Sequence, residues 1–388
     1  MAETISKSKA DHRVVLVKCE DYHAVPDALA EGVGLLGGIE QFCSPDEKIL
    51  LKPNLLLGEK PEEGVTTHPS FFEAAASLFQ SAGAKVVYGD SPAVGSPQLA
   101  VRMSGLGQAA ELVGVELADF IEEVNVHNPD GILLKQFKLA KGILEADGVI
   151  NLPKFKTHGL TRLTGAVKNL FGCLPGVQKT GFHARLPDEN QFGEMLVDLA
   201  ELVSPRLHIM DAIIGMEGNG PRNGQTRQVG LILVSTNPHA LDHCAALLMN
   251  LEPALVPTLK AARKNGRYQP EAIQVLGESI QSCVMADYDV NRSPISTTGT
   301  QGFHMKLLKN LITPKPVIKS DKCTRCGRCV RVCPATPKAI GFVDGRRQPP
   351  QYDYQGCIRC YCCQEVCPDE AIWIKTPPAG QLLNKIHL

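Results

Sequence analysis

The sequence has almost no net charge, no long apolar run and no secretory signal. Its 388 residues carry 40 Lys and Arg against 41 Asp and Glu, which gives a formal net charge of −1. No global field therefore draws the chain to nucleic acid or to a membrane, and we expect neither as a partner. No stretch of roughly eighteen apolar residues is present to span a bilayer. The polar segment Met1–Arg13 lacks the apolar core of a secretory signal.

Cysteine, in contrast, is abundant near the C-terminal end. The spacing Cys-x-x-Cys-x-x-Cys-x-x-x-Cys-Pro occurs at residues 323–334 and again at 357–368. Three thiolates at this spacing hold three corners of an iron–sulfur cube, and the fourth ligates the other cluster. The pattern therefore predicts two 4Fe–4S clusters. Their ligands are Cys323, Cys326, Cys329 and Cys367 for one cluster, and Cys357, Cys360, Cys363 and Cys333 for the other.

Two other uses of cysteine fit this spacing less well. Structural zinc sites take two pairs of cysteines rather than two triplets, and a disulfide framework needs an oxidising compartment. Cys362 lies off the required spacing, so we do not expect it to bind iron. Because cluster ligands must be thiolates, we expect a cytoplasmic protein. The oxygen sensitivity common to such clusters suggests an anaerobic or microaerobic host.

Upstream of residue 300, short apolar runs alternate with amphipathic stretches. The apolar runs predict buried strands at residues 14–18, 48–51, 85–88, 148–152, 207–210 and 230–234. The amphipathic stretches predict helices at residues 70–82, 160–171, 192–202 and 238–249. Such alternation is typical of an α/β fold with a mainly parallel sheet and helices on both faces.

Composition divides the chain into an α/β domain at 1–292, a linker at 293–320, a two-cluster domain at 321–376 and a tail at 377–388. The two-cluster domain resembles a bacterial-type ferredoxin, a small α+β fold, because a strand-like segment follows each cysteine motif. It is rich in Lys and Arg. We therefore expect an external electron donor or acceptor of ferredoxin or flavodoxin type, or an acidic face of the large domain; the alternative is ordinary solvation of these charges.

A basic segment of the α/β domain is the main candidate for a substrate site. Residues 151–187 contain no acid, yet include Lys154, Lys156, Lys168 and His158. If the preceding apolar run is a strand, the segment leaves its carboxyl end, where open α/β sheets bind ligands. We expect a small anionic substrate here, a phosphate or a carboxylate; the alternative is a solvated basic loop.

Acidic residues follow two further strands. Asp90 and Asp211 each come after a predicted strand, and Asp211 precedes the turn-rich segment Gly215–Pro221. Such groups converge on one edge of a parallel sheet, although an Asp in this position is more often a turn or helix cap. The glycine-containing segments Gly32–Gly37 and Gly172–Thr180 match dinucleotide and phosphate loops only loosely, so we predict no nucleotide cofactor.

Several motifs, in order, resemble the family known as domain of unknown function 362 (DUF362), which is often fused to a ferredoxin domain. The resemblance covers most of residues 13–290. Its motifs are Lys52–Leu55, Thr67–Pro69, Gly89–Ser91, Lys154–His158, Lys168–Gly172, Gly215–Pro221 and Leu241–Asp242. Members are generally labelled iron–sulfur centre proteins, so the resemblance implies the architecture and leaves the reaction open.

Two functional hypotheses follow. In the first, the protein is an iron–sulfur oxidoreductase whose clusters pass electrons to a small anionic substrate in the α/β domain. The residues expected to bind that substrate are Lys52, Lys154, Lys156, Lys168 and Asn169. The residues expected to move protons are His68, Asp90, His158 and Asp211. In the second, the protein is a non-catalytic electron carrier or adaptor that docks a partner redox enzyme. A weaker third reading places a metal ion on the same four His and Asp residues.

Overall fold

The computed structural model describes residues 11–176, 178–294 and 310–386. A ten-stranded mixed sheet dominates this part of the chain. Its strands are β1 (Arg13–Lys18), β2 (Lys48–Pro53), β3 (Lys85–Tyr88), β4 (Glu116–Leu117), β7 (Gly148–Leu152), β8 (Lys154–His158), β9 (Arg162–Leu163), β10 (Leu207–Glu217), β11 (Gln225–Ser235) and β12 (Gln274–Gly277). They follow the order β12-β1-β11-β10-β7-β2-β3-β4, with β8 paired to β10 and β9 paired to β8.

Most neighbouring strands run parallel. The pairs β12–β1, β10–β7, β7–β2, β2–β3 and β3–β4 are parallel, whereas β11 is antiparallel to both β1 and β10. The apolar run of β2 is buried from Ile49 onward, as a strand covered on both faces requires. The predicted α/β class with a mainly parallel sheet is confirmed.

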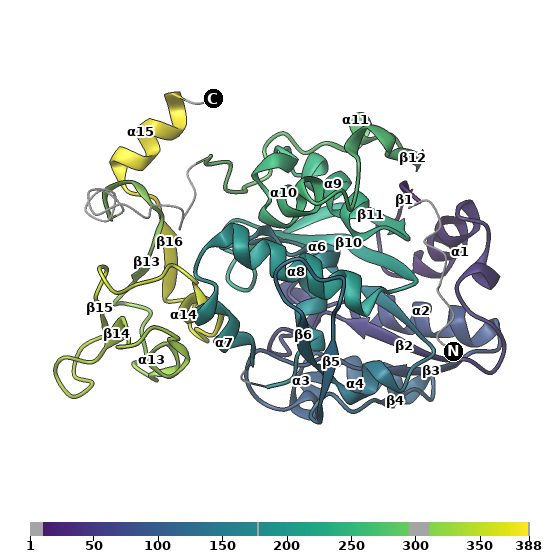
Figure 1. Cartoon of the computed structure of the whole chain (residues 1–388), viewed down its shortest axis with the longest axis horizontal. Helices are drawn as coiled ribbons and strands as arrows, with labels where there is room; N and C mark the ends of the chain where they lie inside the picture. Colours follow the sequence, from purple (N-terminus) through teal and green to yellow (C-terminus); the bar gives the residue numbers. More distant parts are fainter. Residues whose placement is uncertain (1–10, 177, 295–309, 387–388) are drawn as a thin grey trace.

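Helices pack on both faces of this sheet (Figure 1). They are α1 (Val25–Leu35), α2 (Pro69–Ser81), α3 (Pro97–Met103), α4 (Leu106–Leu112), α5 (Lys141–Leu144), α6 (Gly165–Asn169), α7 (Gln178–Arg185), α8 (Glu189–Val203), α9 (Pro238–Leu248), α10 (Pro257–Lys264) and α11 (Ile280–Cys283). Alternation along β10 explains the two layers: Ile209 packs with α1 and α2, and the next residue, Met210, packs with α9 and α10. A separate hairpin joins β5 (Glu123–His127) to β6 (Gln136–Ala140).

The helix predicted at residues 160–171 is only partly correct. Residues 162–163 form β9, which turns back onto β8, and α6 begins at Gly165. Arg162 and Gly165 both have positive φ, a backbone conformation that breaks a right-handed helix. Asp242 of α9 then accepts the amides of Ala166 and Val167 at 2.5 and 3.1 Å, which fixes the start of α6 from outside.

The C-terminal unit is small and contains two short two-stranded sheets. Its elements are β13 (Lys315–Ile318), α13 (Arg328–Val332), β14 (Ile340–Gly341), β15 (Gln351–Tyr352), α14 (Cys362–Glu365), β16 (Ile372–Lys375) and α15 (Pro378–Ile386). β13 pairs with β16, and β14 pairs with β15.

Two of the expected segments, the linker and the tail, contain elements of this unit. β13 lies inside the segment expected as a linker, residues 293–320, of which 295–309 lie outside the described residues. α15 occupies most of the expected tail, and residues 387–388 again lie outside. Within the described ranges, no helix is long and apolar enough to cross a membrane.

Candidate functional site

Two cavities of about 330 Å³ each lie in the C-terminal unit, and each is lined by four cysteines. The first, here the cluster I site, has Cys323, Cys326, Cys329 and Cys367. The second, the cluster II site, has Cys333, Cys357, Cys360 and Cys363. Each site takes three thiols from one motif and one from the other, the grouping that the spacing predicts. This donor set and this exchange of the fourth ligand fit 4Fe–4S clusters.

The cluster sites differ in their surroundings. Arg325 and Arg328 line the cluster I site and are exposed, as is Cys326. Arg325 Nη1 donates to the backbone carbonyl of Arg347 at 2.8 Å, which ties this loop to the segment that contains Arg347. The cluster II site has uncharged walls, and the hydroxyl of Tyr352 donates to Cys363 Sγ at 3.3 Å. The cluster I site therefore has exposed basic side chains beside it, and the cluster II site has none in its wall.

The segment 215–223 holds the C-terminal unit against the α/β domain. Gln364 Nε2 donates to the carbonyl of Asn219 at 2.7 Å, and Asn219 Nδ2 donates to that of Ile372 at 3.2 Å. Arg222 Nη1 donates to the carbonyl of Cys367 at 2.7 Å, while its Nε lies 2.6 Å from Glu59 Oε1. The turn-rich motif that follows Asp211 therefore binds the cluster-bearing unit.

A partly open cavity, here the junction cavity, lies where the two parts meet. The α/β domain contributes basic and polar side chains from the loops after β2, β3 and β8 and from α6 and α7. The C-terminal unit contributes Val332, Cys362, Glu365 and Val366. Cys362 directly precedes Cys363 in the chain, and Cys363 lines the cluster II site. The cavity therefore adjoins a cluster site directly.

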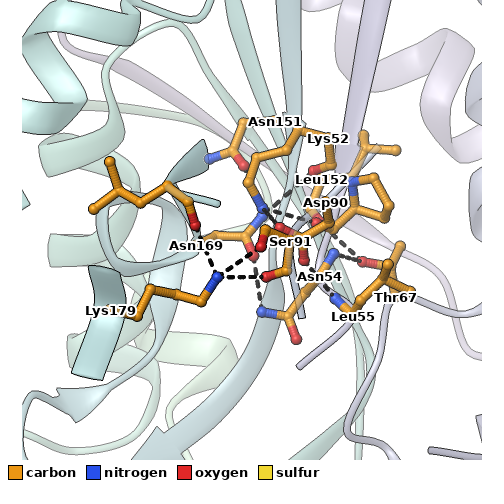
Figure 2. Close-up of polar contacts among 12 residues, drawn as sticks. Lys52, Asn54, Leu55, Thr67, Asp90, Ser91, Asn151, Leu152, Asn169 and Lys179 are labelled. Atoms are coloured by element: carbon orange, nitrogen blue, oxygen red, sulfur yellow. Dashed lines mark hydrogen bonds and ion pairs between the residues drawn. The ribbon is translucent and has the colours of Figure 1, made fainter. Parts of the chain in front are cut away.

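A buried ion pair lies beside this cavity (Figure 2). Lys52 Nζ is 2.8 Å from Asp90 Oδ1, and both side chains are almost fully buried. Asp90 Oδ2 accepts the amide of Leu55 at 2.9 Å. A Cβ added at Gly172 would lie 1.8 Å from Asp90 Oδ1, so only glycine lets the carboxylate sit here. The pair fixes the loops after β2 and β3 against each other.

A chain of side-chain amides continues from this pair (Figure 2). Lys156 Nζ donates to Asn54 Oδ1 at 2.8 Å and to the carbonyl of Val65 at 2.6 Å. Asn54 Nδ2 donates to Asn169 Oδ1 at 2.8 Å, and Asn169 Nδ2 donates to Asn151 Oδ1 at 2.7 Å. Burial lowers the pKa of Lys156 to about 7. Such a network orients α6 on the sheet.

Lys179 closes another side of the cavity. Its Nζ donates to the carbonyl and the hydroxyl of Ser91, at 3.1 and 2.8 Å, and to the carbonyl of Leu174 at 2.8 Å. All three ammonium donors are therefore used. Burial lowers its pKa to about 7 as well. Figure 2 shows this lysine reaching Ser91 from the opposite side to Lys52.

His158 links the basic segment to the C-terminal unit. Its Nδ1 accepts the amides of Leu160 and Thr161, at 3.0 and 3.3 Å, so the ring proton is on Nε2. That Nε2 lies 3.3 Å from Glu365 Oε1. Burial lowers the pKa of His158. Although burial favours the neutral acid, the hydrogen bond from His158 and the charge of Lys168 lower the pKa of Glu365 to about 2.

The structure separates the predicted site residues into two groups. Asp90, Lys156, His158, Lys168 and Asn169 line the junction cavity, and Lys52 contacts it through Asp90.

The remaining predicted residues, Lys154, Asp211 and His68, form a different cluster with Tyr22. Lys154 Nζ lies 2.6 Å from Asp211 Oδ2 and donates to the Tyr22 hydroxyl at 3.0 Å, and the rings of Tyr22 and His68 stack at 3.6 Å. Lys154 and Lys156 alternate along β8 as expected, but they do not face one ligand. Lys154 forms an ion pair with Asp211, its partner on the neighbouring strand β10.

This arrangement argues against a metal on the four His and Asp residues. His68 and Asp211 belong to the Tyr22 cluster, Asp90 is held by Lys52, and His158 faces Glu365. Among the described residues, these four side chains do not come together as a site for a metal ion.

Sequence reasoning did not select four residues that line the cavity: Thr164, Lys179, His183 and Glu365. The first three lie in the acid-free segment 151–187, which is a usable signal. Glu365 lies between two cluster cysteines, and nothing in the sequence indicates that it faces the α/β domain.

Comparisons with known proteins match this architecture. A family model described as a domain of unknown function (DUF362) matches residues 49–247, and one described as a 4Fe-4S dicluster domain matches residues 315–368. The chain is 40% identical over 232 residues to the thylakoid-associated protein sll1697 of Synechocystis sp., which is 60% of this chain and 72% of that protein.

Two further similarities are narrower. The chain is 39% identical over 59 residues, 15% of its length, to an uncharacterized ferredoxin MJ0722 of Methanocaldococcus jannaschii, 75% of which is covered. Among solved structures, the lactate racemase apoprotein from Thermoanaerobacterium thermosaccharolyticum aligns with 64% of this chain and 59% of that chain. Its sequence identity is 11% and its TM-score 0.37, too low to carry an argument.

Proposed function

Because the chain belongs to the DUF362 family and carries a 4Fe–4S ferredoxin-type domain, we propose that it is an iron–sulfur oxidoreductase. In this proposal, two 4Fe–4S clusters pass electrons to a small anionic substrate bound in the junction cavity. The observation that carries it is the composition of the cavity wall. Basic residues of the α/β domain line this cavity together with Cys362, the chain neighbour of the cluster II cysteine Cys363.

The reaction class follows from what the two parts supply. The clusters provide single electrons, so a two-electron reduction of the substrate consumes one from each and two protons. His158 carries a proton on Nε2 at the cavity wall and is the candidate donor. Asp90 is held by Lys52 and Leu55, so its role is to position the loop rather than to move a proton.

The electron donor is proposed to be an acidic protein of ferredoxin or flavodoxin type. Arg325 and Arg328 are exposed beside the cluster I site, and among the described residues neither forms a salt bridge. We further propose a cytoplasmic location and an anaerobic or microaerobic host, because thiolate-ligated clusters need reducing conditions.

The test is substrate-dependent reoxidation of the clusters. Protein purified without oxygen is reduced with dithionite, freed of excess reductant and mixed with candidate carboxylates, phosphates and carbonyl compounds, while cluster absorbance is followed. We expect one class to reoxidise the clusters, and His158→Ala to slow this at least a hundredfold with unchanged cluster spectra. The control His127→Ala changes an exposed histidine on β5.

The same experiment addresses the alternative of a non-catalytic carrier or adaptor. If no small molecule reoxidises the clusters while an oxidised ferredoxin does so rapidly, the enzyme proposal is wrong and the carrier hypothesis stands.

A further inference from the structure

The lysines around the junction cavity are not equivalent. Lys52 is paired with Asp90, Lys156 donates to two oxygens, and Lys179 donates to three. Lys168 differs. Within the described residues its Nζ makes no hydrogen bond or ion pair. It makes a cation–π contact with the Phe171 ring, 4.6 Å from the ring centroid. A lysine ammonium has three donors to satisfy, so Lys168 is the one available to a ligand.

Two further polar groups on the cavity wall lack partners. Thr164 is 5% exposed and His183 is 4% exposed, and both line the cavity. Both Thr164 Oγ1 and His183 Nδ1 are buried and have no hydrogen-bond partner among the residues that the structure describes. A buried polar group left unsatisfied is costly, and such groups in a cavity wall indicate a bound molecule that satisfies them.

From these three groups we infer that Lys168, Thr164 and His183 form the binding site for the carboxylate end of a small molecule. The ammonium and the hydroxyl are two donors, which suits the two oxygens of a carboxylate. His183 is held in the cavity wall by stacking on Phe192, with ring centroids 4.4 Å apart, and its unpaired Nδ1 is the group proposed to bond a polar atom next to the carboxylate. This inference rests on the proposed function in placing the substrate in this cavity.

The wall composition favours a carboxylate over a phosphate. Arginine, the two-pronged partner of both carboxylates and phosphates, is absent from the described residues that line the cavity, so the ammonium and the hydroxyl are the donors at hand, enough for the two oxygens of a carboxylate but not for those of a phosphate. Glu365 also faces the cavity and its charge acts on Lys168, but this carboxylate is engaged by His158 at 3.3 Å. Among the described residues, an incoming carboxylate therefore meets an ammonium that forms no ion pair, with Thr164 Oγ1 and His183 Nδ1 on the same wall and the charge of Glu365 acting on that ammonium.

The test measures binding without electron transfer. Oxidised, cluster-loaded protein is titrated calorimetrically with acetate and pyruvate, and with inorganic phosphate as the comparator, at constant ionic strength. We expect a carboxylate to bind at least tenfold more tightly than phosphate. Lys168→Met should weaken carboxylate binding at least tenfold, and Thr164→Val several-fold. The matched control is Lys260→Met, an exposed lysine on α10.

Thermal unfolding separates a binding role from a structural one. Lys168→Met removes no internal hydrogen bond, so its melting temperature should match that of the wild type, whereas Lys179→Met removes three and should melt lower. Wild-type affinity in Lys168→Met, equal weakening in Lys260→Met, tighter binding of phosphate, or no carboxylate binding would each overturn the inference. Binding without cluster reoxidation would contradict the proposed oxidoreductase activity and leave this site intact.

Discussion

Replacing Gly172 by alanine tests the architecture of the cavity most directly. The added Cβ would lie 1.8 Å from Asp90 Oδ1 and 2.9 Å from Lys52 Nζ. The carboxylate has to move, which breaks its 2.8 Å contact with Lys52 and its 2.9 Å hydrogen bond from Leu55. Removing one partner of a buried ion pair costs about 3–5 kcal/mol.

The loss of folding stability expected for Gly172→Ala is smaller than the cost of removing one partner of the ion pair. Both charged groups remain in Gly172→Ala and can pair again after a shift, and alanine loses less backbone entropy on folding by about 0.4–1 kcal/mol. We therefore expect a net loss of about 2–3 kcal/mol. For a domain of this size, that is a fall of about 4–6 °C in melting temperature.

The assay is scanning calorimetry of cluster-loaded protein without oxygen, at one fixed scan rate because unfolding that releases clusters is irreversible. Gly181→Ala is the matched control. This glycine lies in α7, and its added Cβ would meet nothing within 4 Å. We expect Gly181→Ala to melt at or slightly above the wild-type temperature. Equal melting temperatures for the two variants would refute the steric argument.

Three further outcomes follow from the contacts. Tyr352→Phe removes the hydrogen bond to Cys363 Sγ, so the potential of one cluster should fall by tens of millivolts in a redox titration; Tyr354→Phe, whose hydroxyl donates to the carbonyl of Pro316, should leave both potentials unchanged. Burial sets the pKa values of Lys156 and Lys179 to about 7, so raising the pH from 6 to 8 removes positive charge from the cavity. Acetate should then bind about threefold to tenfold more weakly by calorimetry, and a constant affinity would contradict this. Reduction by an acidic flavodoxin should slow as salt is added, and Arg325→Glu together with Arg328→Glu should slow it further while reduction by dithionite stays unchanged; a rate independent of salt would count against docking at cluster I.

Much of the architecture could be predicted from local sequence. Apolar runs fixed the strands β3 and β7 to the residue, because a buried parallel strand needs continuous apolar side chains. The family resemblance drawn from the ordered motifs is confirmed. The helix at 160–171 was predicted too long, since the pattern of apolar residues does not reveal a positive φ at Arg162.

The candidate site was less predictable than the fold. Lys154 and Lys156 look alike in the sequence, yet Asp211 neutralises one and the amide chain of Asn54 holds the other. The partners that hold Lys154 and Lys156 lie 57 to 132 residues away in the chain. No local signal separates Lys168 from them.

From the sequence alone, the near absence of net charge and of long apolar segments gave no reason to expect nucleic acid or a membrane as a partner. The doubled cysteine spacing predicted the cluster ligands. Ligand spacing is a local property of the chain, so it specified the cluster cysteines and their exchange between motifs. The tertiary structure decided where the clusters face. The motif at 215–223 binds the C-terminal unit so that Cys362 and Glu365 close a basic cavity. Packing between distant segments makes that wall, because burial and pairing of each charge depend on neighbours that only folding brings together.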